Sequence, residues 1–151
     1  REIIVEEKQN IDNFLILVAG KATKKVINLL DIPVLNVGYL NEEDLSNSYN
    51  AADIYVSTSI EDSGPYMINQ SIMCGTPVVA FEMGVALDLV LENQTGSLIK
   101  NFDSKEMAEA IYSILSLNSD DYERLSSNCI ILGKEKCSNF ASNLLFNNIK
   151  Q

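Results

Sequence analysis

Three observations predict an α/β fold, a doubly wound parallel sheet of the Rossmann-like type. Short apolar runs rich in branched residues alternate with stretches of helical periodicity along most of the chain. Glycine or proline separates many of these runs. Several runs are apolar throughout, as expected for strands that are covered on both faces. Folds of this class bind their ligands outside the carboxyl ends of the strands.

The first part of the chain predicts three strands and two helices. Residues 14–19 (FLILVA) form an apolar run closed by a glycine, which is typical of a central parallel strand. A short helix over residues 21–30 and a strand over residues 33–37 follow. Asn41 then caps a helix whose acidic first turn suits the helix dipole, and residues 54–57 form the next strand.

The segment 59–81 contains an acidic loop, a helix start, a helix stop and a strand. Gly64-Pro65 indicates a turn into a helix, because proline supplies the φ angle of a first helical residue and lacks an N–H group. Residues 74–77 (CGTP) end the helix, since glycine suits the left-handed position after a helix and proline prevents its continuation. Residues 78–81 (VVAF) then form a buried strand.

The alternation continues to the end of the sequence. Met107, Ile111, Ile114 and Leu115 lie on one face of an amphipathic helix that Asp103 or Ser104 caps. The other predicted elements are a helix at 86–91, a strand at 96–99, and helices near 120–132 and 138–149.

The composition limits the function. The 151 residues, 46% of them hydrophobic, suffice for one domain, predicted over residues 1–151. The net charge of −10 disfavours nucleic acid as a partner. Histidine is absent, which removes the usual imidazole base and the commonest transition-metal ligand. The three cysteines have no CxxC spacing, so we expect neither a zinc site nor a disulfide framework.

From the sequence we expect neither a membrane-spanning segment nor a secretory leader in this chain. It has no apolar run of 18 residues and no basic-then-apolar leader, so we expect a cytoplasmic protein. The opening stretch from Arg1 resembles the middle of a helix, and we therefore expect a piece of a longer protein, truncated on its amino-terminal side. The acidic charge argues against this part being a membrane-docking face. Weak peripheral association through another domain stays open.

Candidate binding residues cluster after the third and fourth predicted strands. Glu61 lies in the loop at the rim of the sheet, where the alternative interpretation is a solvated acidic turn. The free N–H groups at the start of the following helix suit a phosphate. Asn69 lies one turn further on, where it points toward the cleft or is simply a surface amide. A second glycine turn before a helix, at residues 83–86, repeats the anion-binding pattern more weakly.

With these residues assembled, the segment from about Val37 to Leu115 resembles the donor-binding carboxyl-terminal domain of retaining glycosyltransferases of the GT-B fold, family 4. The order of the motifs matches as well as their content. The matching motifs are Gly38, Ala51-Ala52-Asp53, Glu61-Asp62-Ser63-Gly64, Cys74-Gly75-Thr76-Pro77-Val78-Val79, Gly84 with Asp88-Leu89-Val90, and Thr95-Gly96.

The resemblance implies specific roles. Glu61 corresponds to the first acid of the E-x7-E motif of the family and would contact the donor sugar near the reacting carbon. Asn69 stands where the second acid accepts hydrogen bonds from the ribose hydroxyls; it keeps one carbonyl acceptor but lacks the charge. The arginine and lysine that neutralise the diphosphate in the family have no matching position here. The amino-terminal domain that holds the acceptor is absent from the sequence, so we expect the fragment alone to be inactive.

The resulting hypothesis is a glycosyltransferase that moves a sugar from a nucleotide diphosphate sugar to a glycan or lipid-linked acceptor, with retention, as in polysaccharide biosynthesis. Helix ends would stabilise the diphosphate, so no metal and no cofactor besides the donor is expected. The predicted catalytic residue is Glu61. The predicted donor-binding residues are Ser63, Gly64, Pro65, Tyr66, Met67, Ile68, Asn69, Gly84, Val85 and Ala86.

Two alternatives stay open. A non-catalytic module derived from such a domain would bind a nucleotide sugar or a partner subunit, and Asn69 is the feature that favours it. An unrelated receiver-type or flavodoxin-type domain is the second. Receivers carry paired aspartates at the end of the first strand, where this sequence has Ala19-Gly20.

Overall fold

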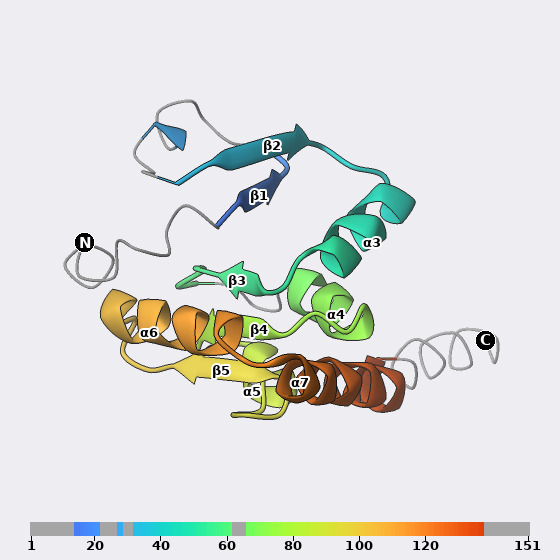
Figure 1. Ribbon diagram of the computed structural model, residues 1–151, viewed down its shortest axis with the longest axis vertical. Coiled ribbons are helices and arrows are strands. Elements are labelled where there is room, and N and C mark those ends of the chain that lie inside the picture. The colour runs from blue at the N-terminus through green and yellow to red at the C-terminus, as the bar shows by residue number, and fades with distance from the viewer. Residues whose placement is uncertain (1–13, 22–26, 29–31, 62–65, 138–151) are drawn as a thin grey trace, which may run out of the picture. The chain divides into compact units, whose positions relative to one another are not determined.

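A computed structural model of the chain describes residues 14–21, 27–28, 32–61 and 66–137 (Figure 1). Contacts divide the chain into two compact units, Arg1–Ser48 and Tyr49–Gln151. Both contain parallel strands and the chain alternates strands with helices, which confirms the predicted α/β class. The single domain over residues 1–151 stays a prediction.

The first unit holds a pair of parallel strands. Ile16 lies opposite Val34, and the register shifts after Val18. The two predicted strands are confirmed to within two residues at each end, whereas most of the predicted helix at 21–30 lies outside the described residues. The elements are β1 (Ile16–Ala19), β2 (Val34–Gly38) and α3 (Glu42–Ala51), whose last turn belongs to the second unit.

Asn41 caps helix α3 as predicted. Its Oδ1 accepts a hydrogen bond from the Asp44 N–H at 2.8 Å, and its Nδ2 donates to Asp44 Oδ2 at 2.8 Å. The cap satisfies one of the N–H groups that a helix start leaves without an intrahelical partner.

The second unit contains a three-stranded parallel sheet in the order β3-β4-β5. In the register, Val78 of β4 lies opposite both Tyr55 and Gly96. The predicted strands at 78–81 and 96–99 are confirmed with the same bounds. The elements are β3 (Tyr55–Ser57), α4 (Tyr66–Met73), β4 (Val78–Phe81), α5 (Ala86–Leu89), β5 (Gly96–Ile99), α6 (Ser104–Leu115), α7 (Ser119–Leu132) and the π-helix η2 (Gly133–Cys137).

Helices cover both faces of this sheet. Successive residues of β4 point to opposite faces, so they contact two different clusters of buried residues. Val78 and Ala80 pack into one buried cluster, while Val79 and Phe81 pack into another. All four are at most 7% exposed, which explains why the sequence of β4 is apolar throughout. The first cluster adds Ile68, Ile72, Ala86, Leu89, Val90, Cys129 and Leu132, and the second adds Ile99, Met107, Ile114 and Leu125.

The connection from α4 into β4 follows the predicted chemistry. Gly75 adopts the left-handed conformation at φ +80°, and a Cβ there would lie 3.0 Å from the side chains of Ser126 and Ile130. The Ser71 hydroxyl donates to the Thr76 carbonyl at 2.9 Å, and the Thr76 hydroxyl donates to the Tyr49 carbonyl at 2.7 Å. The first bond joins α4 to the residues that enter β4, and the second joins those residues to the last turn of α3.

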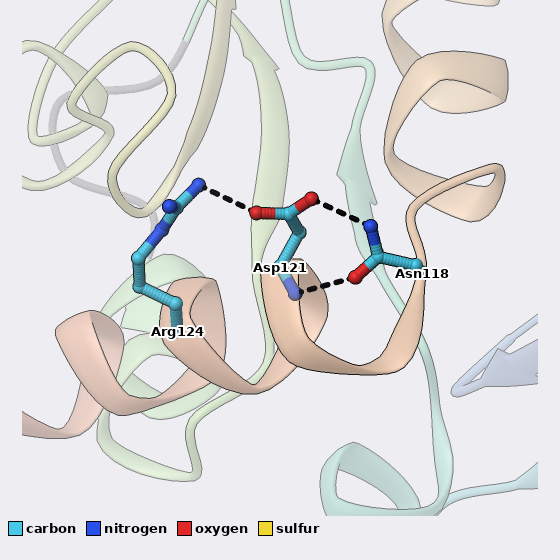
Figure 2. Close-up of polar contacts among 3 residues, drawn as sticks. All are labelled: Asn118, Asp121 and Arg124. Carbon is cyan, nitrogen blue, oxygen red and sulfur yellow. Dashed lines mark hydrogen bonds and ion pairs between the residues drawn. The ribbon is translucent and has the colours of Figure 1, made fainter.

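Side chains cap the two long helices. Asp103 accepts hydrogen bonds from the backbone N–H groups of Lys105 and Glu106 at the start of α6, as predicted. At the start of α7, Asn118 Oδ1 accepts from the Asp121 N–H at 2.9 Å, and Arg124 pairs with Asp121 at 3.0 Å (Figure 2). The predicted helix near 138–149 lies outside the described residues.

Candidate functional site

The carboxyl ends of β3 and β4 lie at one edge of the second unit's sheet. Ser57, the last residue of β3, is opposite Ala80, and the two strands are parallel. Glu61 follows β3, and the turn at Gly84 follows β4, so both connections leave from the same edge. Glu61 is exposed. This edge is where doubly wound folds bind ligands.

Helix α4 begins at Tyr66, directly after the predicted helix start. Ser63, Gly64 and Pro65 lie outside the described residues. Tyr66 and Met67 are exposed, whereas Ile68 is buried in the core. The Tyr55 hydroxyl donates to Met67 Sδ at 3.4 Å, which ties the first turn of α4 to β3. The N–H groups of this first turn have no acceptor within the helix.

Asn69 is the most informative residue of the edge. It lies in the second half of α4's first turn, and its side chain is partly buried. Its Oδ1 is buried and accepts no hydrogen bond from any of the residues that the structure describes. Buried polar atoms in folded proteins almost always have a partner, so this carbonyl oxygen is suited to a donor supplied by a ligand.

The second glycine turn, at residues 83–86, has fewer free backbone N–H groups than its sequence predicts. Gly84 has the expected left-handed conformation at φ +50°. However, the Ala86 N–H donates to the Met83 carbonyl at 3.1 Å, and α5 is only four residues long. Gly84 and Val85 are therefore the residues of this turn whose N–H groups could reach an anion.

Helices α4 and α5 pack on the same face of the sheet. Ile68 and Ile72 of α4 share one buried cluster with Ala86 and Leu89 of α5. The cluster includes Val78 of β4 and excludes the residues of β4 that point the other way. The two helix starts thus lie on one side of β4 and follow neighbouring strands.

A buried hydroxyl for which the sequence predicted no partner joins the end of α5 to the start of β5. Thr95 Oγ1 donates to the Leu89 carbonyl at 2.7 Å and accepts from the Leu91 N–H at 2.8 Å. Thr95 is 1% exposed. These bonds fasten the end of α5 to the start of β5. The only sequence signal for this contact was the Thr95-Gly96 dipeptide. A dipeptide does not show which backbone groups its hydroxyl will bond.

Two further findings limit the chemistry. Burial raises the pKa of the Cys129 thiol to about 12, so this cysteine is an unreactive core residue at neutral pH. Burial, and then the neighbouring Tyr55, raises the pKa of Tyr49. Within the described part of the chain, no group of three or more acidic or cysteine side chains could hold a metal ion, and no helix is long and apolar enough to cross a membrane.

A hollow of about 90 Å³ lies elsewhere, at the amino end of β5. Gly96, Leu117, Asp121 and Arg124 are among its lining residues. Because doubly wound folds bind ligands at the opposite ends of their strands, this hollow is not the candidate donor site.

The fold is similar to that of solved glycosyltransferases. The carboxyl-terminal domain of a glycosyl transferase group 1 family protein, LpcC from Francisella tularensis, matches with a TM-score of 0.70, at 18% identity over 89% of this chain and 75% of that one. Anabaena HepE in complex with UDP-glucose matches with a TM-score of 0.68, at 21% identity over 90% of this chain and 40% of that one.

Sequence comparison gives the family. A D-inositol 3-phosphate glycosyltransferase from Mycobacterium sp. (strain KMS) is 36% identical over 76 residues, which are 50% of this chain and 17% of the relative. The chain therefore matches about a sixth of the length of that relative. The sequence model of the family described as "Glycosyl transferases group 1" matches residues 4–130. Because this match covers most of the sequence, the chain belongs to the glycosyl transferases group 1 family.

Proposed function

We propose that this chain is the donor-binding part of a glycosyltransferase that moves a sugar from a nucleoside diphosphate sugar to a glycan or lipid-linked acceptor, with retained configuration. Polypeptide outside these 151 residues supplies the acceptor-binding half, and the chain alone does not turn over. The protein acts in the cytoplasm. Family membership supports the proposal, and the solved HepE complex with UDP-glucose makes UDP-sugars the first donors to test.

The buried, unpaired Oδ1 of Asn69 is the observation that carries the proposal at the level of residues. A neutral amide oxygen accepts a hydrogen bond from a sugar hydroxyl without placing a negative charge near a diphosphate. We assign it to a ribose hydroxyl of the donor nucleotide. Compared with an acid, an amide at this position makes a weaker hydrogen bond with the ribose hydroxyl. It also avoids the repulsion between a carboxylate and the diphosphate.

The other predicted residues have complementary roles in the proposal. The first-turn N–H groups of α4 and those of Gly84 and Val85 bind the pyrophosphate. Glu61, exposed after β3, contacts the sugar beside the bond that breaks. Because helix termini supply positive charge at the leaving diphosphate, the proposal includes no metal ion. Transfer that continues at full rate in excess EDTA would agree with this part.

The test is calorimetric titration of the chain with UDP and with UDP-glucose. Asn69→Ala should weaken both ligands about five- to tenfold, the equivalent of one hydrogen bond. Glu61→Ala should weaken UDP-glucose and leave UDP unchanged, because only the sugar contacts Glu61. Gln94→Ala, at an exposed position away from this edge, is the matched control and should change neither.

The pattern of the two variants decides the outcome. Equal loss of both ligands in Glu61→Ala would contradict its assignment to the sugar. Unchanged affinity for both ligands in Asn69→Ala would refute the donor site. Turnover by the longer natural polypeptide, measured as release of UDP in the presence of an acceptor, tests the transferase activity itself. The family match does not favour the alternative of a purely binding module.

A further inference from the structure

The turn between β5 and α6 has an unusual backbone conformation. The Asp103 N–H donates to the Lys100 carbonyl at 3.2 Å, which closes a β-turn. The central residues of this turn, Asn101 and Phe102, have φ angles of +53° and +55°. Positive φ at both central positions is typical of a type I′ turn, in which glycine, asparagine and aspartate dominate. Asparagine tolerates this conformation, but for a bulky residue such as phenylalanine it is an outlier.

Phe102 differs from every other described residue with positive φ, because the rest are glycines or asparagines. The asparagines are Asn93 and Asn101. A glycine at position 102 would adopt the same φ angle without strain. Strained residues are concentrated at functional sites, so the presence of phenylalanine here requires a reason other than the formation of the turn.

The ring of Phe102 is held in place and is open to solvent. It packs edge-to-face against the ring of Phe81, with the ring centroids 5.2 Å apart and the ring planes at 80°. Phe81 is 7% exposed, whereas Phe102 is 53% exposed. A single exposed apolar side chain is common on protein surfaces and needs no explanation. An exposed ring on a strained turn does need one, because packing covers only part of the ring and the backbone conformation disfavours it.

The turn lies at the edge of the sheet that contains the candidate donor site. Strand β5 is parallel to β4, so the chain leaves both strands at the same carboxyl edge. Phe81 packs into the buried cluster that contains Met107 of α6. Ile68 of α4 and Ala86 of α5 belong to the cluster on the opposite face. Because Phe102 contacts Phe81, its ring lies on the α6 side of β4, away from the helix starts that the proposed function assigns to the pyrophosphate.

We propose that Phe102 is a specificity-determining residue whose exposed ring stacks on a sugar ring of the acceptor glycan. The axial C–H groups of a pyranose form a flat apolar face, and this face releases water when it packs on an aromatic ring. The pyrophosphate takes the α4 and α5 side of β4, which leaves the α6 side for the acceptor. The inference rests on the proposed function, because it is sugar transfer that brings an acceptor to this edge.

NMR titration of the longer natural polypeptide, saturated with UDP, tests the proposal. The probes are methyl β-D-glucopyranoside, methyl β-D-galactopyranoside and methyl α-D-mannopyranoside. An aromatic ring shifts the C–H signals of a sugar stacked on it upfield, so at least one probe should show this shift. Phe102→Gly, which suits the turn, should abolish the shift and raise the dissociation constant of that probe about five- to tenfold. Phe102→Tyr keeps the ring and should retain both. Tyr112→Ala, the matched control, removes an exposed ring further along α6 and should change neither.

The proposal is overturned if no probe shows an upfield shift, or if the shift persists in Phe102→Gly. A shift confined to the glucose of UDP-glucose would assign the ring to the donor and overturn its assignment to the acceptor. We expect Phe102→Gly to unfold at the same urea concentration as the parent or a higher one. A clearly lower concentration would show that the contact with Phe81 is the reason for the aromatic residue, which also overturns the proposal.

Calorimetric titration with UDP separates this inference from the proposed function. If the parent does not bind UDP, the donor site is refuted and this inference with it. If UDP binds with the same affinity to the parent and to Phe102→Gly while no probe shifts, only the stacking on Phe102 is refuted.

Discussion

Replacing Thr95 by valine tests how the connection between α5 and β5 is held. The substitution keeps the shape of the side chain and removes the hydroxyl that donates to the Leu89 carbonyl and accepts from the Leu91 N–H. Both backbone groups would then be left beside a methyl group at a position that is 1% exposed. Water cannot replace the hydroxyl without opening the connection between α5 and β5.

The expected loss of stability follows from these two backbone groups. An unpaired buried backbone group costs about 1–3 kcal/mol, so two cost roughly 2–6 kcal/mol. The added methyl recovers about 0.8 kcal/mol of apolar burial. We expect Thr95→Val to lower the free energy of unfolding by about 1–5 kcal/mol. Thr95→Ser keeps the hydroxyl and loses one methyl group, so it should cost only about 1 kcal/mol.

The assay is urea unfolding of the chain and both variants, followed by circular dichroism at several protein concentrations. The free energy in water comes from linear extrapolation, and an unchanged slope shows that the exposed surface is the same. A valine variant within about 0.5 kcal/mol of the parent, which is the effect of an ordinary surface change, would refute the reasoning. A serine variant less stable than the valine variant would also contradict it.

Three further changes have expected outcomes. A Cβ on Gly96 would overlap the backbone carbonyl of Val78, so Gly96→Ala should cost more than about 3 kcal/mol in urea unfolding, whereas Gly38→Ala, with open space at φ +70°, should cost about 1–2 kcal/mol. Asn118→Ala removes the cap of α7 and should lower the thermal midpoint by the equivalent of about 1 kcal/mol. Asn118→Ser keeps a side-chain oxygen for the cap, so it should retain most of this stability. The pKa of Cys129 is raised from 9.0 to about 12, so the folded state keeps its proton where the unfolded state loses it. The resulting stabilisation is complete below about pH 9 and is lost as the pH rises toward 12, by at most about 1.4 kcal/mol per pH unit, and Cys129→Ala should flatten this part of the stability profile.

Local signals in the sequence were sufficient for most elements of the fold. The strand at Val78–Phe81 follows from four consecutive apolar residues after a glycine and a proline, and it has the predicted bounds. The helix expected over residues 86–91 instead ends at Leu89. The reason is the hydroxyl of Thr95, which takes the Leu91 N–H that a continuing helix would use. Sequence periodicity carries no information about such a partner.

The positions of the two helix starts were predictable from the sequence, but the hydrogen bonds around them were not. Glycine and proline signals placed the two helix starts after neighbouring strands. They could not show that the Ala86 N–H is already bonded to the Met83 carbonyl, because that bond depends on the conformation of the turn. The burial of the Asn69 side-chain oxygen was equally unpredictable, because it depends on the residues packed around it. An amide in the middle of a helix is usually solvated, whereas this oxygen is buried.

Unsatisfied polar groups give an argument that does not depend on family membership. The hydroxyls of Ser71, Thr76 and Thr95 are deeply buried, and each has a backbone partner. Asn69 Oδ1 is the one buried side-chain oxygen or nitrogen in the described ranges that has none. A protein that satisfies its other buried groups with short local bonds would lose about 1–3 kcal/mol by leaving this one unpaired. That cost disappears if a ligand hydroxyl binds there, so the chain should be measurably more stable in the presence of its donor than in its absence.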